Sequence, residues 1–443
     1  MLIITECYKV VVIFPRKKER ETAWILGDKR VADFIYDNIL QEKYDFSKCQ
    51  RNTFTQQGKK RIVYNYPKLS VEDILCQYLK RQIDKIFKIR YASRSRIINL
   101  LFNILPIIKD MNDFVIIRAD FKSFFDSVLT KHVYKKYIRE SLMGRADKEI
   151  LEQYLKQFQY CYAGLCLSNG MAEIICRDFD KRIKARLNQY GVFFYERYVD
   201  DILIIINRYI SRDIFIALLD STINEVFGEC PVELNTAPGK FSFITRRSLK
   251  KTQNFNFLGY EYEINLDAKD NIQFKYGITE KKRKKYSGII ERAIIQYKKD
   301  GNLELLRQRI KIFSSRIVIA KTIGSSTFDW LTKGVVANYN ELRFHTSALT
   351  RDTDRFLKKL YFELLRKNGC PLPYFMKQST SEDSIYNLYS TMRRNRTIMF
   401  EKGIGVSRET LLKWIMKLVP TYNSCGKDYY KIVVDYLEII KVE

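Results

Sequence analysis

The sequence predicts an α+β body followed by a helical C-terminal region, and three patterns indicate this. Apolar runs rich in β-branched residues, at 114–120 and 192–206, are typical of buried strands. Apolar residues at 71–87 recur at helical spacing instead. From about residue 278 to the end, the pattern is mostly helical and strongly basic. Mixed strands and helices followed by helices alone favour an α+β fold.

The charge balance points to an anionic partner. The chain has 443 residues, of which 78 are Lys or Arg and 51 are Asp or Glu, so its formal net charge is +27. A surplus of this size repels itself unless something anionic neutralises it. Nucleic acid is the leading candidate, and an anionic membrane surface is the second. No apolar run is long enough to cross a bilayer, and no signal peptide is expected at the start.

Histidine and cysteine usage restricts the chemistry. With only two histidines, His132 and His345, zinc sites built on histidine and general-base catalysis by histidine are not expected. A metal would therefore be bound by oxygen and would be a hard cation. The nine cysteines form no regular framework, so we expect reduced thiols and a cytoplasmic protein.

The elements can be predicted in chain order. A turn at 57–58 leads into a short strand, and Ser70 with Asp73 resembles a capping box that starts the helix over 71–87. A second helix is expected to end before Pro106. The later elements are a strand at 114–120, helices over 130–160, a turn at 164–170 leading into a helix to about 187, a hairpin at 192–206, a helix at 212–228, and strands near 233–234, 241–244 and 255–264.

Three acids at predicted strand ends suggest catalysis. Asp200 and Asp201 lie between two hydrophobic strands, where adjacent carboxylates cost repulsion and desolvation. A plain hairpin tip would favour Asn-Gly or Asp-Gly, so a compensating cation is expected. Asp120 ends another apolar strand, and two such ends in one sheet would bring the acids together. Three oxygen ligands at one point suit two Mg²⁺ ions and a triphosphate.

The residues around these acids resemble a known family. Tyr198-Val199-Asp200-Asp201 resembles the YxDD motif of reverse transcriptases, and residues 118–128 look like the first catalytic block of that family. The resemblance implies a right-hand polymerase with fingers, palm and thumb. It further implies that Asp120 and Asp200 bind two Mg²⁺ ions, with Mn²⁺ able to substitute. The backbone carbonyl of Phe121 would assist, and Asp201 would complete the catalytic triad.

The same resemblance assigns dNTP-binding residues. Phe125 matches the steric-gate position, where a bulky ring excludes a 2′-hydroxyl; core packing is the alternative. Lys240 matches the lysine that approaches the triphosphate. Lys59 and Arg61 occupy the place of the finger residues that clamp phosphates, and Arg61 is favoured because a guanidinium binds phosphate in a bidentate way. The order of these blocks along the chain supports the resemblance.

Two further blocks handle the nucleic acid in this family. Leu258, Gly259 and Tyr260 resemble the primer grip, a hairpin that holds the primer end. Residues 164–174 occupy the place of the template loop but lack its usual Pro and Gln. Asn169 and Gly170 are expected to shape that turn. Because this block departs from the pattern, a fixed short template or untemplated addition stays open.

The resemblance also predicts boundaries, partners and setting. We expect an N-terminal extension at 1–54, fingers and palm at 55–275, a helical thumb at 276–345 and a helical C-terminal region at 346–443. Expected partners are an RNA template or non-coding RNA, the DNA product and dNTPs, with a homo-oligomer or a partner subunit left open and no membrane. Segments 306–313 and 334–342 are similar to those of bacterial defence-associated and abortive-infection reverse transcriptases, which implies phage defence, in a type 3 system subunit.

Competing interpretations remain. One is untemplated or protein-primed DNA synthesis, in which a tyrosine or serine hydroxyl starts the product. The other is an RNA-binding scaffold that resembles a polymerase but has lost the chemistry. The presence of all three acids and the gate aromatic disfavours the scaffold.

Overall fold

The computed structural model describes residues 41, 43–56, 59–67, 70–249, 252–323, 327–377 and 386–441. The chain divides into two compact units: unit 1 comprises Met1–Ile97 and Asp110–Ser248, and unit 2 comprises Ile98–Lys109 and Leu249–Glu443. The predicted extension at 1–54 lies largely outside the described residues. The other predicted functional boundaries stay predictions.

Unit 1 is built on a four-stranded antiparallel sheet with the order β4-β5-β3-β6. Its central strand β3 is buried along its whole length, as the run of β-branched residues requires. The predicted strand at 114–120 and the predicted hairpin at 192–206 are both confirmed. The strands are β3 (Val115–Asp120), β4 (Val192–Tyr198), β5 (Asp201–Ile206) and β6 (Ser242–Thr245).

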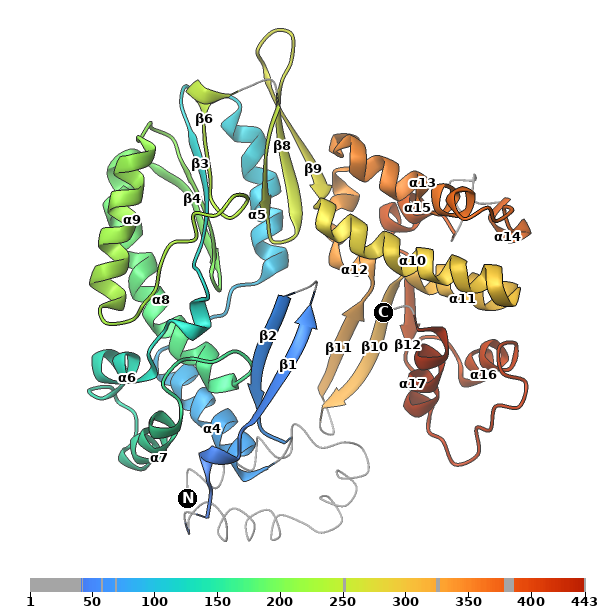
Figure 1. Cartoon of the computed structure of the whole chain (residues 1–443), viewed down its shortest axis with the longest axis horizontal. Coiled ribbons are helices and arrows are strands. Elements are labelled where there is room, and N and C mark those ends of the chain that lie inside the picture. Colours follow the sequence, from blue (N-terminus) through green and yellow to red (C-terminus); the bar gives the residue numbers. More distant parts are fainter. Residues whose placement is uncertain are drawn as a thin grey trace. The chain divides into compact units, whose positions relative to one another are not determined.

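Two helices pack on one face of this sheet, as Figure 1 shows: α8 (Cys166–Leu187) and α9 (Arg212–Phe227). The ring of Phe121 contacts Phe179 of α8 and Phe227 of α9, with centroid distances of 5.4 and 5.8 Å. This aromatic core therefore fixes the backbone that directly follows Asp120. The other elements of unit 1 are η2 (Phe46–Lys48), β1 (Gln50–Gln56), β2 (Lys59–Asn65), α4 (Val71–Ile86), η3 (Phe124–Asp126), α6 (Thr130–Val133), the π-helix η4 (Tyr134–Ile138), α7 (Arg145–Gln157), η5 (Asn188–Tyr190) and η6 (Arg246–Ser248).

Two predicted helix boundaries, the start at Ser70 and the end before Pro106, can be compared with the structure. Ser70 accepts a hydrogen bond from the Asp73 amide at 3.2 Å, so the predicted start of α4 is confirmed. The predicted end of the next helix is wrong, because α5 (Arg94–Ile108) continues through Pro106. Pro106 lies in the last turn, so the ladder loses one hydrogen bond close to its end and the helix tolerates it.

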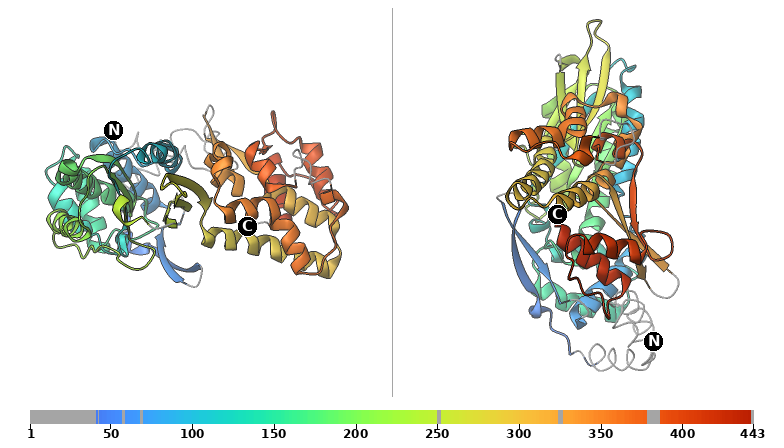
Figure 2. Two further views of the ribbon diagram at one scale, coloured as in Figure 1. Left: turned by 90° about the horizontal axis from the view of Figure 1, so that it is seen from above. Right: turned by 90° about the vertical axis from the view of Figure 1, so that its right-hand side faces the viewer.

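Unit 2 begins with an antiparallel sheet of order β7-β8-β9: β7 (Thr252–Phe257), β8 (Tyr260–Leu266) and β9 (Ile272–Ile278). Three helices follow, α10 (Glu280–Asp300), α11 (Leu303–Phe313) and α13 (Arg351–Lys367), and the views in Figures 1 and 2 agree that α10 runs beside the other two. The helical pattern predicted from residue 278 is thus confirmed in its first part.

The C-terminal region is not wholly helical, which corrects the prediction. A three-stranded sheet of order β11-β10-β12 is formed by β10 (Arg316–Ile323), β11 (Thr327–Lys333) and β12 (Thr397–Phe400). The run Ile317-Val318-Ile319 is β-branched, and β-branched residues favour strands. The remaining elements are α12 (Val335–Asn338), η7 (Asn340–Phe344), η8 (Thr346–Ala348), α14 (Tyr374–Lys377), α15 (Leu388–Arg393), α16 (Arg408–Met416) and α17 (Tyr429–Ile440).

The structure also bears on the expectations about membrane-spanning helices and about the cysteines. In the described part of the chain, no helix has both the length and the apolar character that a membrane crossing needs. Every cysteine in the described residues is a free thiol, and those at 76, 161, 176 and 230 are buried.

Candidate functional site

The three predicted acids come together at one end of the sheet in unit 1. In the antiparallel register of β3 and β5, Asp120 lies opposite Asp201. The turn between β4 and β5 consists of Val199 and Asp200, and the Phe121 amide donates to the Asp200 carbonyl at 3.4 Å. The convergence of two strand ends, expected from the sequence, is therefore confirmed. The turn is shorter than predicted, because Asp201 already belongs to β5.

The carboxyl groups of Asp120 and Asp200 repel each other. The Asp120 side chain is only 3% exposed. Burial raises the pKa of Asp200 to about 6, and the negative charges of Asp120 and then Asp201 add to this increase. A shift in this direction means that the ionised pair is unfavourable without an additional cation. Binding of a cation beside Asp120 and Asp200 would therefore be favourable.

Two cations already contact the acids. The Lys240 ammonium forms an ion pair with Asp120, and the Arg118 guanidinium forms one with Asp201 at 2.5 Å. Burial raises the pKa of Asp201, and the charge of Arg118 opposes that increase. Arg118 also donates to the carbonyls of Gly239 and Lys240, at 2.7 and 2.8 Å. It therefore positions both an acid and the loop that carries the lysine.

Sequence reasoning assigned no role to Arg118 or to Asn235. The Asn235 amide donates to the Asp120 carbonyl at 2.7 Å, and its side chain donates to the Asp120 carboxylate at 3.4 Å. One signal was available for Arg118: residues two apart on a strand share a face, so Arg118 and Asp120 point the same way. No sequence signal indicated Asn235, because its contact depends on how the 234–241 segment returns to β3.

The donor set suits a hard divalent cation only in part. Asp120 and Asp200 supply carboxylate oxygens, which such cations prefer. A bound cation would relieve the repulsion between these two carboxylates. Among the described residues, no group of three or more acidic, histidine or cysteine side chains is arranged to hold a metal. Asp201 contacts Arg118 instead. The pair formed by Asp120 and Asp200 thus fits a cation, whereas Asp201 would have to exchange partners to join it.

The turn that carries Asp200 is strained, and the side chain of Arg197 supports it. Val199 has φ of +60°, a left-handed conformation that is costly for a β-branched residue. The buried guanidinium of Arg197 donates to the Val199 carbonyl at 3.1 Å and pairs with Glu173 and Asp180, each at 2.9 Å. These contacts tie the turn to helix α8. Glu173, which lies within the 164–174 block, is therefore paired with Arg197.

Of the predicted dNTP-binding residues that the structure describes, Lys240 forms an ion pair with one of the acids and Arg61 does not. Phe125 lies in the short helix η3, half-buried, with its ring 5.7 Å from that of Phe124. Lys240 reaches the acids, as described. Arg61 is exposed on β2, and among the described residues no hydrogen bond or ion pair joins it to the three acids. The backbone of Lys59 belongs to β2, but its side chain lies outside the described part.

The predicted turn at Asn169 and Gly170 is wrong, because helix α8 already begins at Cys166. Gly170 is buried against α4, and a Cβ there would lie 3.3 Å from Ile83 Cγ2. The turn is formed earlier, at Gly164, whose φ is +101°. A Cβ at Gly164 would come within 2.4 Å of the Tyr64 carbonyl oxygen, so this residue allows β2 to pack closely.

The predicted primer-grip residues form a hairpin in unit 2. Leu258 and Gly259 make the turn between β7 and β8, with φ of +49° and +84°. Tyr260 is buried, and its hydroxyl donates to Glu341. The predicted hairpin at this position is confirmed, whereas its contact with a primer stays a prediction.

Comparisons with known proteins add little to this geometry. No protein-family model matches the sequence, and no curated protein matches it. A C-terminally truncated apo telomerase from Candida tropicalis is 15% identical, with a TM-score of 0.34; the match covers 52% of this chain and 55% of that one. The chain thus spans only about half of that protein's length.

Two longer matches are similar in quality. Telomerase from Candida tropicalis in complex with the TWJ fragment of telomeric RNA is 11% identical, with a TM-score of 0.36, over 93% of this chain and 68% of that one. The corresponding complex from Candida albicans is 11% identical, with a TM-score of 0.35, over 92% and 70%. Scores this low do not establish a shared fold, so the functional argument depends on the site itself.

Proposed function

We propose that this protein is an RNA-directed DNA polymerase that adds dNTPs to a 3′-hydroxyl by nucleotidyl transfer with two divalent ions. One observation supports the proposal most strongly: the strand ends that carry Asp120 and Asp201 converge, with Asp200 in the turn beside them. Burial, with the added negative charge of Asp120, raises the pKa of Asp200 to about 6. Lys240 pairs with Asp120, but Asp200 beside it is costly to keep ionised unless a further cation binds.

The acids and their partners have distinct roles in this proposal. Asp120 and Asp200, with the Phe121 carbonyl, would hold Mg²⁺ or Mn²⁺, and Asp201 would join them after leaving Arg118. The bound ions would activate the attacking hydroxyl and stabilise the leaving pyrophosphate. Lys240, which contacts Asp120, would neutralise or protonate that pyrophosphate. Arg118 would keep the Lys240 loop in place through its two carbonyl contacts.

Other residues would bind the substrates. Phe125 would lie beneath the sugar and exclude a 2′-hydroxyl, and Arg61 with Lys59 would clamp the triphosphate. The turn at Leu258 and Gly259 would approach the primer end. The biological setting that we propose is phage defence with an associated non-coding RNA, on the basis of the C-terminal segments alone.

The proposal can be tested by primer extension with the purified full chain and its co-purifying RNA, omitting one dNTP at a time. We expect incorporation that depends on Mg²⁺ or Mn²⁺ and stops at the omitted base. The variant Asp200→Asn should lose this activity, whereas Asp213→Asn, an exposed acid at the start of α9, should retain it.

The other outcomes identify the competing functions. No incorporation by the wild type with either ion would leave the RNA-binding scaffold. Incorporation that survives nuclease removal of the RNA would indicate untemplated synthesis. A product covalently attached to the protein would indicate protein priming.

A further inference from the structure

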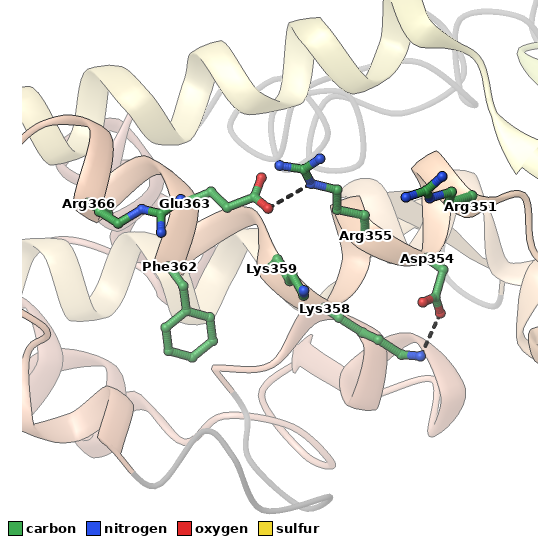
Figure 3. Close-up of a pocket in the computed structure, with 8 residues that line it drawn as sticks. All are labelled: Arg351, Asp354, Arg355, Lys358, Lys359, Phe362, Glu363 and Arg366. Carbon is green, nitrogen blue, oxygen red and sulfur yellow. Dashed lines mark hydrogen bonds and ion pairs between the residues drawn. The ribbon is translucent and has the colours of Figure 1, made fainter.

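Helix α13 in unit 2 has one face that the polymerase site does not explain. Its buried face packs into the unit through apolar residues such as Phe356, Leu360 and Leu364. Its opposite face lines an open groove with a volume of about 850 Å³, drawn in Figure 3. The groove is lined by Arg351, Asp354, Arg355, Lys358, Lys359, Phe362, Glu363 and Arg366.

The groove has an excess of positive charge. Five of its lining residues are basic and two are acidic, which leaves a surplus of three charges. The acids are already paired, since Arg355 contacts Glu363 at 2.8 Å and Lys358 contacts Asp354 at 2.7 Å. In the part of the chain that the structure describes, no ion-pair partner is found for the other three cations: Arg351, Lys359 and Arg366.

The spacing of the cations forms a stripe along the helix. Arg351, Arg355 and Lys359 are four residues apart, so each step advances about 6 Å along the axis and stays on nearly the same side. Phe362 and Arg366 continue this stripe, which is about 22 Å long in total. Phe362 is half-buried, and in Figure 3 its ring projects from the helix beside the basic side chains.

We infer that this groove on α13 binds a single strand of nucleic acid through its phosphates, with Phe362 stacking on a base. A row of cations that follows one line suits a phosphodiester backbone, and one half-buried ring that projects among them suits an unpaired base. An apolar protein partner would need a continuous apolar surface, whereas here one aromatic ring is surrounded by charges. The inference deepens the proposed function, because it adds a surface that holds a strand outside the catalytic site.

The test is equilibrium binding of a fluorescein-labelled single-stranded RNA to the full chain, measured by anisotropy between 50 and 300 mM salt. All titrations contain EDTA. The variant combines Arg351→Gln, Lys359→Gln and Arg366→Gln. Each lost phosphate contact on a single strand changes the slope of log K against log salt by about 0.7, so we expect a slope smaller by about 2. Phe362→Ala should weaken binding by about five- to a hundredfold, as for one lost stack.

A matched control removes three exposed cations from unit 1, by Lys131→Gln, Lys135→Gln and Arg145→Gln. It should keep the slope near that of the wild type. Circular dichroism and thermal unfolding establish that every variant is folded. The same titrations with single-stranded DNA, duplex RNA and polyglutamate identify which ligand the groove prefers.

The outcomes are decisive in both directions. A smaller slope for RNA or DNA single strands, absent in the control, supports the site and shows which strand occupies it. An unchanged slope, an equal loss in the control, or equally tight binding of duplex RNA or polyglutamate would overturn it. Because EDTA prevents catalysis, these titrations measure strand binding alone, whereas primer extension measures catalysis, so failure here is distinguishable from failure of the polymerase proposal.

Discussion

Asp120 and Asp201 lie opposite each other in the antiparallel pairing of β3 and β5, yet they contact different cations. Asp120 pairs with Lys240, whereas Asp201 pairs with Arg118. Asp200, in the turn beside them, is the acid whose pKa rises to about 6. The site therefore has three carboxylates and two cations, and Asp200 is the group whose charge remains least compensated.

Removing the charge of Asp200 should stabilise the metal-free protein. The pKa of Asp200 is raised from 3.8 to about 6 in the folded state, so its ionisation opposes folding. Above about pH 6 the Asp200→Asn variant should be more stable than the wild type by about 1–3 kcal/mol. Below about pH 4, where Asp200 is protonated in both the folded and unfolded states, the difference should vanish. Denaturant unfolding in EDTA from pH 3.5 to 8 measures it.

The exposed acid Asp213 offers the control, because Asp213→Asn should give no such pH-dependent gain. If Asp200→Asn is destabilising at pH 8 in EDTA, the carboxylates do not repel each other as described.

Arg197 should position the turn that carries Asp200 without touching substrate. A lysine keeps the charge but cannot contact Glu173, Asp180 and the Val199 carbonyl together. Arg197→Lys should therefore lower stability by about 1–3 kcal/mol and lower kcat for incorporation at least tenfold, with little change in the KM for dNTP. Steady-state kinetics on the folded variant measure both constants.

The matched control is Arg182→Lys, on an exposed guanidinium that also contacts two acids, Asp178 and Glu225. If both variants keep full kcat, the strained conformation of Val199 does not need support from Arg197.

The sequence predicted the parts of the site that depend on strand ends and local turns. The buried runs before Asp120 and around Asp200 were predicted to be strands, and two strand ends that converge in one sheet would bring their acids together. The long-range pairings of Arg118 and Arg197 could not be predicted, because many basic residues were equally available. Asn169 and Gly170 were misplaced because the turn is made at Gly164 and helix α8 already begins at Cys166. The strand at Arg316–Ile323 was missed because its apolar residues were interpreted as part of a helical region.

Phe125 should control sugar selection. With Phe125→Ala, the space beneath the nucleotide would admit a 2′-hydroxyl, so the preference for dNTP over rNTP should fall at least tenfold. Single-nucleotide incorporation with matched dNTP and rNTP measures the ratio of kcat/KM. Phe54→Ala, which removes an exposed ring on β1, should leave that ratio unchanged. Unchanged selectivity in Phe125→Ala would assign this ring to core packing.

Gly164 should be sensitive to the smallest side chain. Its φ is +101°, and an added Cβ would lie 2.3 Å from Val63 Cγ1. Gly164→Ala should therefore lower the free energy of unfolding by about 2–4 kcal/mol, through both strain and overpacking. Gly301→Ala, where φ is +66° but no atom lies within 4 Å, should cost only about 1–2 kcal/mol. Equal losses in the two variants would mean that the contact with β2 is unimportant.

The central claim is that Asp120 and Asp200 together hold a divalent cation. The most direct measurement is Mn²⁺ binding by electron paramagnetic resonance at pH 7.5, for the wild type, Asp120→Asn, Asp200→Asn and the control Asp213→Asn. We predict saturable binding to the wild type and the control, and affinities at least tenfold weaker for both site variants. Equal Mn²⁺ binding by all four proteins would contradict the account.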